Sequence, residues 1–473
     1  MRYILTTIFF IVISLTSFAQ NCNCGENFRS MVDKVKKNYV GYPDKIKSDN
    51  FLKFQNFTDS LQKISISSNP YECINICREW LSFFRDRHLG FGIDFNKLSQ
   101  DSVRFFFSNA ERTDWTESKF KDYLRNKKTK IDSIEGIWQH ERNIYKIGII
   151  RDREKKDLEF IAFILDADGS RWTKQQVKFR LVKIGSQYKT IYFNAGDHSK
   201  SLQTLNKQND TLNFGIFGKW IKGDNNAKNM ATYLDPSIPE PTFITLDKET
   251  NLMVIPSFDL RFKRKIDSLI DQNKQILNNT KHLIIDIRNN LGGSINSFEK
   301  LIPYLYTNPI SIDGASVLAT EDNLRDSYEK LYPDAPDSLQ QKLKINAKKL
   351  REHLGELYPL YKPDTIKLSV ITINPSRISV LMNGNTASSG EHFILRAEQS
   401  KKVTLYGQNS AGSIDYTEIV STKLPCSFYT LTYPACKSSR IYRRPLNNIG
   451  ISPHIKIPNQ INDWIKHVRN YNF

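Results

Sequence analysis

The sequence predicts an α/β protein with a helical N-terminal domain and an inserted all-β domain. Three observations carry this prediction: a helical residue pattern over about 26–87, strand-rich segments separated by turn signals over about 134–221, and strands alternating with helices from about 241 onward. A chain of 473 residues has room for about two or three domains. We therefore expect a leader, a helical domain, a β-rich and barrel-like domain, and an α/β core, at residues 1–19, 20–100, 101–235 and 236–473.

The leader has the three-part pattern of a cleaved secretory signal. Arg2 precedes an apolar run over residues 4–15, and a small-residue site follows at 17–19. The run is shorter than the roughly 20 residues that a membrane-spanning helix needs, and no later segment is long and apolar enough either. We expect cleavage after Ala19, export to a periplasm or the cell exterior, and no stable membrane insertion.

The composition indicates a globular chain, with 39% hydrophobic and 12% aromatic residues. The net charge of +18 could indicate a nucleic-acid partner. The Lys and Arg residues are scattered, however, and the chain is expected to leave the cytoplasm, so we expect no nucleic-acid partner. A well-solvated basic surface is the favoured interpretation, and attraction to acidic surfaces or acidic peptides stays open.

Six cysteines in an exported chain indicate disulfides, and they fall into three close pairs: Cys22 with Cys24, Cys73 with Cys77, and Cys426 with Cys436. We expect the first pair to tie the N-terminal segment to the helix that carries the second pair. The third pair is expected to close a hairpin. Spacing does not fix the partners. Zinc binding is the weaker alternative, because no histidine pair lies nearby at finger spacing.

The helical and β-rich domains each have a local signature. Asn69-Pro70 supplies a cap and a first-turn proline, which predict a helix start. The helical pattern ends near Asp86, where strand-like residues begin. In the β-rich domain, residues 176–181 alternate between polar and apolar side chains, as a half-buried strand does.

The α/β core has two buried-strand runs, at residues 283–287 and 379–382. Between them, a Lys/Glu-rich helical insertion spans about 325–360, with Pro333 and Pro336 at its approach. This insertion is either a lid beside the active site or a solvated surface helix.

A glycine-rich turn follows the first of these strand runs. The segment from Asp286 to Ser294 contains the pair Gly292-Gly293. Paired glycines let backbone N–H groups approach a ligand closely, as an oxyanion hole requires. Glycines between a strand and a helix are also often ordinary tight turns.

A serine follows the second strand run, where small polar residues lead into a helix that is expected to begin near Ser388. The positive potential of a helix N-terminus favours both an attacking serine and a developing oxyanion. With Glu391 three residues on, the local pattern is also that of an ordinary capping box.

A histidine at the junction of the helical domain and the following strand completes the set. His88 is one of eight histidines in the chain. A lone histidine is usually a surface residue or a satisfied core residue, so His88 is a candidate general base only together with the other two segments. His392, one helical turn beyond Ser388, is the rival base. A side chain four residues on shares the helix face of the serine without necessarily reaching its oxygen.

These segments, in this order, resemble the C-terminal processing, or tail-specific, peptidase family and its tricorn-like branch. Residues 286–293 resemble the family's Asp-Leu-Arg-Asn-Asn-Gly-Gly-Gly turn, and residues 386–391 match its Thr-Ala-Ser-x-x-Glu nucleophile segment. Residues 407–412 are similar to its Gly-x-x-x-x-Gly segment, and residues 447–453 to its closing Gly-Val-x-Pro segment. The resemblance covers the chain from about 240 to the end, with a similar helical N-terminal module. It implies a crotonase-like (ββα superhelix) protease core.

Departures from the family pattern indicate the branch. The branch with a serine–lysine dyad has its lysine where this chain has Ser413. The tricorn-like branch instead uses an upstream histidine, which His88 matches. That branch orients its histidine through a serine just before it and a glutamate near the closing segment, where this chain has Arg87 and Asn447. Asn447 could still accept a hydrogen bond, as asparagine does in some cysteine–histidine sites.

The sequence thus predicts an exported serine endopeptidase that acts on peptides or unfolded proteins and needs no metal or organic cofactor. The alternatives are a catalytically impaired peptide-binding protein that keeps the fold, and a structural or glycan-binding envelope protein. A histidine base predicts activity that falls on acidification around pH 6–7. The predicted site comprises the nucleophile Ser388, the base His88, the oxyanion N–H groups of Gly292, Gly293 and Ser389, and the supporting residues Asn447 and Glu391.

Overall fold

The structure is a computed structural model that describes residues 22–126, 131–152, 159–167, 169–185, 187–214, 217–223, 238–330, 337–458 and 460–470. The predicted signal segment, residues 1–19, lies outside the described residues, as do Pro333 and Pro336. Within the described ranges, no helix is both long enough and apolar enough to span a bilayer.

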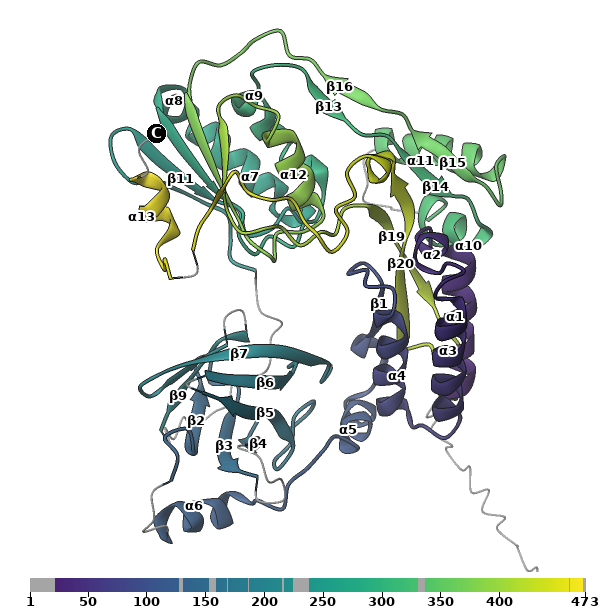
Figure 1. Ribbon diagram of the computed structural model, residues 1–473, viewed down its shortest axis with the longest axis vertical. Helices are drawn as coiled ribbons and strands as arrows, with labels where there is room; N and C mark the ends of the chain where they lie inside the picture. Colours follow the sequence, from purple (N-terminus) through teal and green to yellow (C-terminus); the bar gives the residue numbers. More distant parts are fainter. Residues whose placement is uncertain are drawn as a thin grey trace, which may run out of the picture.

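The described chain has a mixed α/β fold, which confirms the predicted class at that level. Figure 1 shows a helical bundle and a β barrel in the lower half of the view and an α/β domain above them. A long two-stranded ribbon descends from the α/β domain and runs beside the helical bundle (Figure 1).

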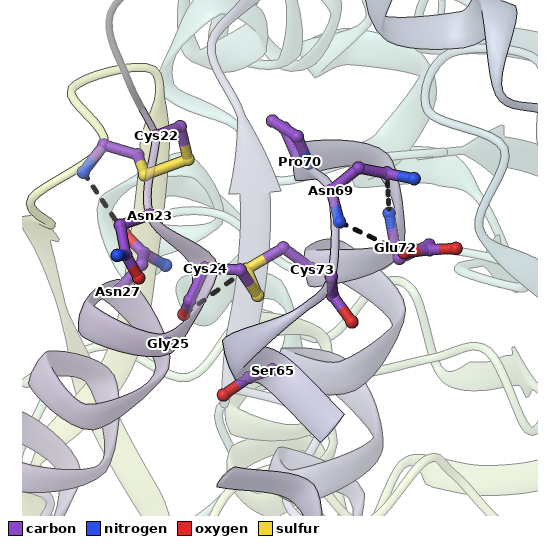
Figure 2. Close-up of a disulfide and its surroundings, with 12 residues drawn as sticks. Cys22, Asn23, Cys24, Gly25, Asn27, Ser65, Asn69, Pro70, Glu72 and Cys73 are labelled. Carbon is purple, nitrogen blue, oxygen red and sulfur yellow. Dashed lines mark hydrogen bonds between the residues drawn. A yellow bond between two sulfur atoms is a disulfide. The ribbon is translucent and has the colours of Figure 1, made fainter. Parts of the chain in front are cut away.

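Helices form the N-terminal part of the described chain. They are α1 (Cys24–Asn38), α2 (Tyr42–Lys45), α3 (Phe51–Ile66), α4 (Pro70–Ser82), α5 (Gln100–Ser108) and α6 (Glu117–Asn126), with the short 3₁₀ turn η1 (Phe95–Lys97). The predicted helix start is confirmed: Asn69 accepts from the Glu72 N–H, and the Asn69 N–H donates to the Glu72 carboxylate (Figure 2). Because Pro70 has no N–H to leave unpaired, it fits the first turn.

Two disulfides anchor the start of this bundle. Cys24 pairs with Cys73 on α4, so that half of the prediction for the first cysteine pair is confirmed (Figure 2). Cys22 instead pairs with Cys426, with Cα atoms 5.2 Å apart. Cys77 and Cys436 are free and buried.

The predicted hairpin disulfide between Cys426 and Cys436 is therefore wrong. Cys426 lies in the turn before strand β20 (Tyr429–Ser438), and Cys436 lies near the far end of that strand, opposite Thr417. At about 3.3 Å per residue, the extended strand separates the two cysteines by roughly 20 Å. A disulfide needs Cα atoms within about 7 Å.

Eight antiparallel strands close into a barrel, because the first strand pairs with the last. They are β2 (Gly136–His140), β3 (Lys146–Arg151), β4 (Glu159–Asp166), β5 (Val177–Ile184), β6 (Gln187–Phe193), β7 (Lys200–Gln208), β8 (Thr211–Asn213) and β9 (Lys219–Lys222). Large rings fill the interior, among them those of Trp138, Trp172, Phe179 and Trp220.

The predicted alternation over residues 176–181 is interrupted in β5. Ala162 pairs with Phe179 while Phe163 pairs with Val177, so a β-bulge leaves Lys178 without a partner in the ladder. A bulge turns two successive side chains toward the same face. Lys178 consequently lies inside the barrel and is fully buried.

A six-stranded sheet forms the centre of the α/β domain, in the order β10-β11-β12-β17-β18-β21. Its strands are β10 (Thr242–Thr245), β11 (Thr250–Val254), β12 (His282–Asp286), β17 (Arg377–Met382), β18 (Val403–Gly407) and β21 (Ile455–Lys456). All neighbours except β10 and β11 are parallel. The two predicted strand runs are confirmed as β12 and β17.

Helices and short turns surround this sheet. They are α7 (Leu260–Gln272), α8 (Lys274–Asn279), η3 (Ile295–Ser297), η4 (Glu299–Leu301), α9 (Ile302–Leu305), α12 (Ser389–Ala397) and α13 (Trp464–Arg469). One apolar cluster packs α7 and α12 against the sheet, and a second cluster contains residues of α13 and other sheet side chains. Buried apolar clusters with residues on both faces are expected for a largely parallel sheet.

A second, antiparallel sheet joins the α/β domain to the helical bundle. It comprises β1 (Gly90–Ile93), β14 (Ala315–Leu318), β15 (Leu357–Tyr361), β19 (Tyr416–Lys423) and β20. A separate strand pair, β13 (Ile310–Ile312) and β16 (Asp364–Ile366), runs between the two regions (Figure 1). The hydrophobic core of the bundle includes residues of β19 and β20, so the bundle and the ribbon form one packed unit.

The helical insertion contains α10 (Glu321–Asn323), the π-helical turn η5 (Leu324–Tyr328) and α11 (Asp337–Arg351). Ala347 and Leu350 of α11 are buried in a cluster with Val317 and Leu324. One face of α11 is therefore packed against β14 and η5.

Candidate active site

Three neighbouring parallel strands bring the sequence motifs together. Strand β12 ends at Asp286, β17 at Met382 and β18 at Gly407. Because the carboxyl ends of parallel strands meet at one edge of a sheet, the segments that follow these strands leave the sheet side by side. The glycine-rich turn, the Ser388 loop and the segment after Gly407 all begin at this edge.

Ser388 sits at the sharp turn between β17 and α12, which begins at Ser389. Its backbone angles are φ 52° and ψ −117°, in a region that a side chain makes costly by about 1–3 kcal/mol. An ordinary capping residue has extended backbone angles. The expected capping box of Ser388 and Glu391 is present. Ser388 differs from an ordinary cap in its backbone angles, and it has the backbone strain found where a strand-to-helix turn presents a nucleophile.

A buried carboxylate holds this strained turn in place. Glu391 accepts from the backbone N–H of Ser388 at 3.1 Å. It also accepts from the Ser410 hydroxyl at 2.6 Å, the Gly412 N–H at 2.8 Å and the Ser413 N–H at 2.7 Å. Four donors satisfy one buried carboxylate, so Glu391 fastens the Ser388 turn to the segment that follows β18.

Gly292 lies directly against the Ser388 turn. A Cβ atom on Gly292 would be 2.7 Å from the Cβ of Ser388 and 2.9 Å from the Ser389 nitrogen. Its φ of +104° also favours glycine. The Gly292 N–H, however, already donates to Oδ1 of buried Asn290 at 2.9 Å, so this N–H is engaged within the turn.

Gly293 directs its own peptide groups toward α12. The Gly292 carbonyl accepts from the Phe258 N–H, and the Ser294 N–H donates to the Phe258 carbonyl. Since the C=O and N–H groups of one trans peptide point in opposite directions, the N–H and C=O of Gly293 both point away from Phe258. The Ser389 hydroxyl donates to that carbonyl at 2.7 Å. Over the described ranges, neither the Gly293 N–H nor the Ser389 N–H has a hydrogen-bond acceptor.

Two hydrogen bonds that involve backbone atoms orient His88. Its Nδ1 is 2.7 Å from the carbonyl oxygen of Tyr416, and its backbone N–H donates to Asp86 Oδ1 at 2.9 Å. A carbonyl can only accept, so Nδ1 carries the proton and Nε2 of the neutral ring is left as a base. Asp86 in turn accepts from the Tyr39 hydroxyl at 2.7 Å. Burial and the nearby Asp86 raise the pKa of Tyr39, which keeps it a donor.

The segment that carries His88 contacts the Ser388 loop and the closing segment. Nη1 of Arg87 donates to the carbonyl of Gly384 at 3.2 Å. Nδ2 of Asn448 donates to the carbonyl of Arg85 at 2.6 Å. Arg87, at the position where the tricorn-like branch has a serine, therefore ties the His88 segment to the loop that leads to the candidate nucleophile.

The rival base, His392, is held neutral. Burial lowers its pKa to about 4, and the positive charges of Arg396 and Arg440 and the proximity of His88 add to this shift.

Asn447 contacts groups other than the His88 ring. With its amide oriented so that both atoms are satisfied, it donates to the Gly412 carbonyl at 3.1 Å and accepts from Lys45 Nζ at 2.5 Å. Its backbone N–H donates to buried Asp415 at 2.8 Å. Ser413, which occupies the lysine position of the dyad branch, has a buried hydroxyl without a hydrogen-bond partner in the described part of the chain.

Sequence reasoning did not identify the groups that orient the site. Tyr416 acts through its backbone carbonyl, for which no side-chain pattern exists. Asn290 lies within the glycine-rich segment, but nothing in the sequence indicates that its side-chain amide accepts a hydrogen bond from a neighbouring N–H. Asp86 stands two residues before His88, and that spacing is the one signal that could have suggested a backbone contact.

Comparisons with known proteins place this geometry in context. The model of peptidase family S41 matches residues 250–457. No curated protein matches the chain in sequence.

Several solved structures match most of the chain at low sequence identity. Mature CPAF has a TM-score of 0.47 at 12% identity, covering 92% of this chain and 93% of that one. A lipoprotein from Streptococcus agalactiae has a TM-score of 0.40 at 14% identity, covering 94% and 96%. The photosystem II D1 C-terminal processing protease has a TM-score of 0.39 at 12% identity, covering 93% and 94%.

Proposed function

Because the chain belongs to peptidase family S41 through residues 250–457 and is a serine peptidase, we propose that it is an exported endopeptidase that forms an acyl-enzyme at Ser388. The observation that carries this proposal is the strained backbone of Ser388 beside two N–H groups without acceptors among the described residues, those of Gly293 and Ser389. Strain of this kind persists where the surrounding structure holds it for function.

The first chemical step uses His88 as the general base. Because the Tyr416 carbonyl fixes the proton on Nδ1, Nε2 is free to take the Ser388 proton as the hydroxyl oxygen attacks a peptide carbonyl. Tyr39 and Asp86 hold the backbone of His88, so their role is to position the imidazole. The same imidazole then returns the proton to the leaving amine.

The tetrahedral intermediate places negative charge on the former carbonyl oxygen. The N–H groups of Gly293 and Ser389 are the proposed donors to this oxygen, and the partial positive charge of the α12 N-terminus adds to them. Gly292 has a different role here from the one expected: its N–H is engaged by Asn290, and its lack of a side chain makes room for Ser388. Water then hydrolyses the acyl-enzyme.

The supporting residues act through the backbone of the site. Glu391 fixes the Ser388 turn through four hydrogen bonds, and Asn447 holds the closing segment against Gly412 and Lys45. We also propose that the six-stranded sheet and its helices are the crotonase-like core. Export rests on the pattern of residues 1–19 and on two disulfides, which are typical of oxidising compartments.

The test is labelling by a serine-reactive fluorophosphonate together with cleavage mapping on a library of unfolded peptides. The wild type should be labelled and should cleave peptides, and Ser388→Ala should do neither. His88→Gln should lose both activities, whereas His392→Gln should retain them, because a buried imidazole whose pKa is lowered to about 4 is a weak base.

Three outcomes would contradict the proposal. Equal labelling of the wild type and Ser388→Ala would exclude Ser388 as the nucleophile. Loss of activity in His392→Gln but not in His88→Gln would assign the base to α12 instead. Binding of peptides without any cleavage would favour the catalytically impaired peptide-binding protein.

A further inference from the structure

A pocket of about 280 Å³ borders α12, the helix that begins directly after Ser388. Its walls come from α12, the segment between β13 and β14, and residues 438–444. Three residues that line the pocket are close in the chain to groups of the site. Ile414 follows Ser413, and Thr417 follows Tyr416. His392 lies one helical turn beyond Ser388. The pocket therefore borders segments of the chain that also carry groups of the site.

One lining cation has no counterion. Arg396 is 8% exposed, and its guanidinium makes no hydrogen bond or ion pair with any described residue. Its guanidinium lies 4.9 Å from the centroid of the Phe298 ring, which covers one face of the group and leaves its N–H donors to be satisfied elsewhere. Burial lowers the pKa of Arg396, and the carboxylate of Glu299 opposes this shift, but a guanidinium stays charged in any protein.

The other arginines of the pocket are already paired. Arg440 binds Asp415 at 2.9 Å, and Arg444 binds Glu398 at 2.5 Å. Arg443 binds Asp313. These three add to the positive potential of the pocket, while Arg396 alone among its arginines is without a partner on the described chain.

We propose that this pocket is a substrate subsite that binds a carboxylate through Arg396. A carboxylate matches the planar N–H array of a guanidinium and supplies the anion that a buried, uncompensated cation requires. The carboxylate comes either from the C-terminus of the peptide or from an Asp or Glu side chain. This inference rests on the proposed function, because it assigns the pocket to the substrate of Ser388.

The rise of α12 gives a rough distance between the carboxylate and the cleaved bond. Arg396 is two helical turns beyond Ser388, which corresponds to about 12 Å along the axis. An extended peptide advances about 3.3–3.6 Å per residue. The carboxylate should therefore lie roughly three residues from the cleaved bond.

The test uses one cleaved synthetic peptide in four forms. The first pair differs only at the C-terminus, a free carboxylate or an amide, with the terminus three residues from the cleaved bond. The second pair has amidated, longer chains and differs by Glu or Gln at that same position. For the wild type, kcat/KM should be at least tenfold higher for the carboxylate member of one pair or of both, and the pair that responds identifies the source.

Arg396→Gln should remove this preference and leave kcat/KM for the neutral members within about threefold of wild type. Arg396→Lys should restore part of the preference. Arg125→Gln, which removes an exposed arginine from α6, is the control for the loss of one positive charge and should behave as wild type. Fluorophosphonate labelling of every variant reports whether the Ser388 site itself is intact.

Binding of the same peptides to Ser388→Ala, followed by fluorescence anisotropy, tests the pocket without catalysis. Tighter binding of the carboxylate forms that disappears in Ser388→Ala/Arg396→Gln supports the subsite even if no peptide is cleaved, in which case the proposed function fails and the subsite stands. Equal handling of carboxylate and neutral forms by the wild type overturns the subsite. A loss in Arg396→Gln that is the same for all four peptides overturns it as well, because Arg396 would then be structural.

Discussion

The barrel and the α/β domain each bury a cation that has no carboxylate partner among the described residues, and they do so in different ways. Lys178, inside the barrel, is fully buried and donates to the Phe193 carbonyl at 2.7 Å. Its ammonium lies 4.0 Å from the centroid of the Trp172 ring and is also close to the rings of Tyr145 and Tyr192. Arg396, in the α/β domain, lines a pocket, and its guanidinium donates to no described residue.

The difference lies in what each cation can do when it is desolvated. Burial holds the pKa of Lys178 well below its usual value, so this amine can release its proton and persist in the barrel interior as a neutral group. A guanidinium cannot release its proton and must find an anion. A buried cation therefore indicates a binding site when two conditions hold: the group cannot lose its charge, and it faces open space. Lys178 in the barrel meets neither condition.

The largest predicted effect is on peptidase activity, which should depend on Ser388 in the α/β domain and not on Lys178 in the barrel. Ser388→Ala should lower peptidase activity at least about a thousandfold, whereas Lys178→Met should leave it within about twofold, because the barrel interior takes no part in the proposed chemistry. Peptide cleavage by both variants, matched for thermal unfolding, is the measurement. Loss of activity in a well-folded Lys178→Met variant would bring the barrel into the mechanism.

A smaller loss should follow from a methyl group beside the nucleophile. Gly292→Ala places its Cβ 2.7 Å from that of Ser388, and a displacement on the order of 1 Å can cost about a hundredfold in rate. Gly196→Ala, beside the barrel, meets one side-chain atom at 3.6 Å and should have little effect. Rates of fluorophosphonate labelling for the two variants compare the regions directly, and equal rates would show that Gly292 is not tightly packed against Ser388.

The neutral state of Lys178 can be measured through stability. Its folded pKa is lowered by burial, so the unfolded state binds more protons over the window between the folded pKa and the unfolded value of about 10.4. Stability should therefore rise with pH in that window, by up to about 1.4 kcal/mol per pH unit. Urea unfolding at two alkaline pH values should show this rise in the wild type and a weaker one in Lys178→Met. Equal slopes would mean that the buried lysine stays charged.

The smallest predicted effect is a loss of stability at acidic pH, and it should be similar in the barrel and in the α/β domain. Burial lowers the pKa of His140 in the barrel and of His282 in the α/β domain to about 4. In each ring Nδ1 accepts a hydrogen bond, from the Arg142 N–H at 3.1 Å and from the Arg377 guanidinium at 2.6 Å. Protonation breaks that bond, so the native state should lose stability as pH falls from about 6.5 toward 4.

At about pH 5.5 the loss should be about 1 kcal/mol for each histidine. His140→Gln and His282→Gln should each reduce the acid sensitivity of the free energy of urea unfolding by that amount. A variant with the acid sensitivity of the wild type would show that its ring is not buried neutral.

The parts of the fold that local patterns specify were predictable. The cap at Asn69, the run that became β12 and the run that became β17 each depend on neighbouring residues in the chain. The position of Lys178 was not predictable, because the bulge in β5 arises from its pairing with β4 and not from its own sequence. The partner of Cys426 likewise depends on the bundle packing against the ribbon.

The candidate site divides in the same way. The motif around Ser388 and Glu391 is contiguous in sequence, so its residue types could be recognised. The N–H of Gly293 lacks an acceptor because of Phe258, a residue from another segment. Phe258 forms hydrogen bonds with the Gly292 carbonyl and the Ser294 N–H, the groups on either side of Gly293. The orientation of His88 depends on a carbonyl that is 328 residues away in the chain.

The Cys22–Cys426 bond spans 404 residues of sequence, so the barrel and most of the α/β domain lie within one covalent loop. A single backbone nick inside that loop, including one made by the enzyme on another copy of itself, would not release a fragment. The two pieces would migrate together in a non-reducing gel and separate after reduction. The segments that carry His88 and Ser388 would thus stay on one molecule even after such a cut.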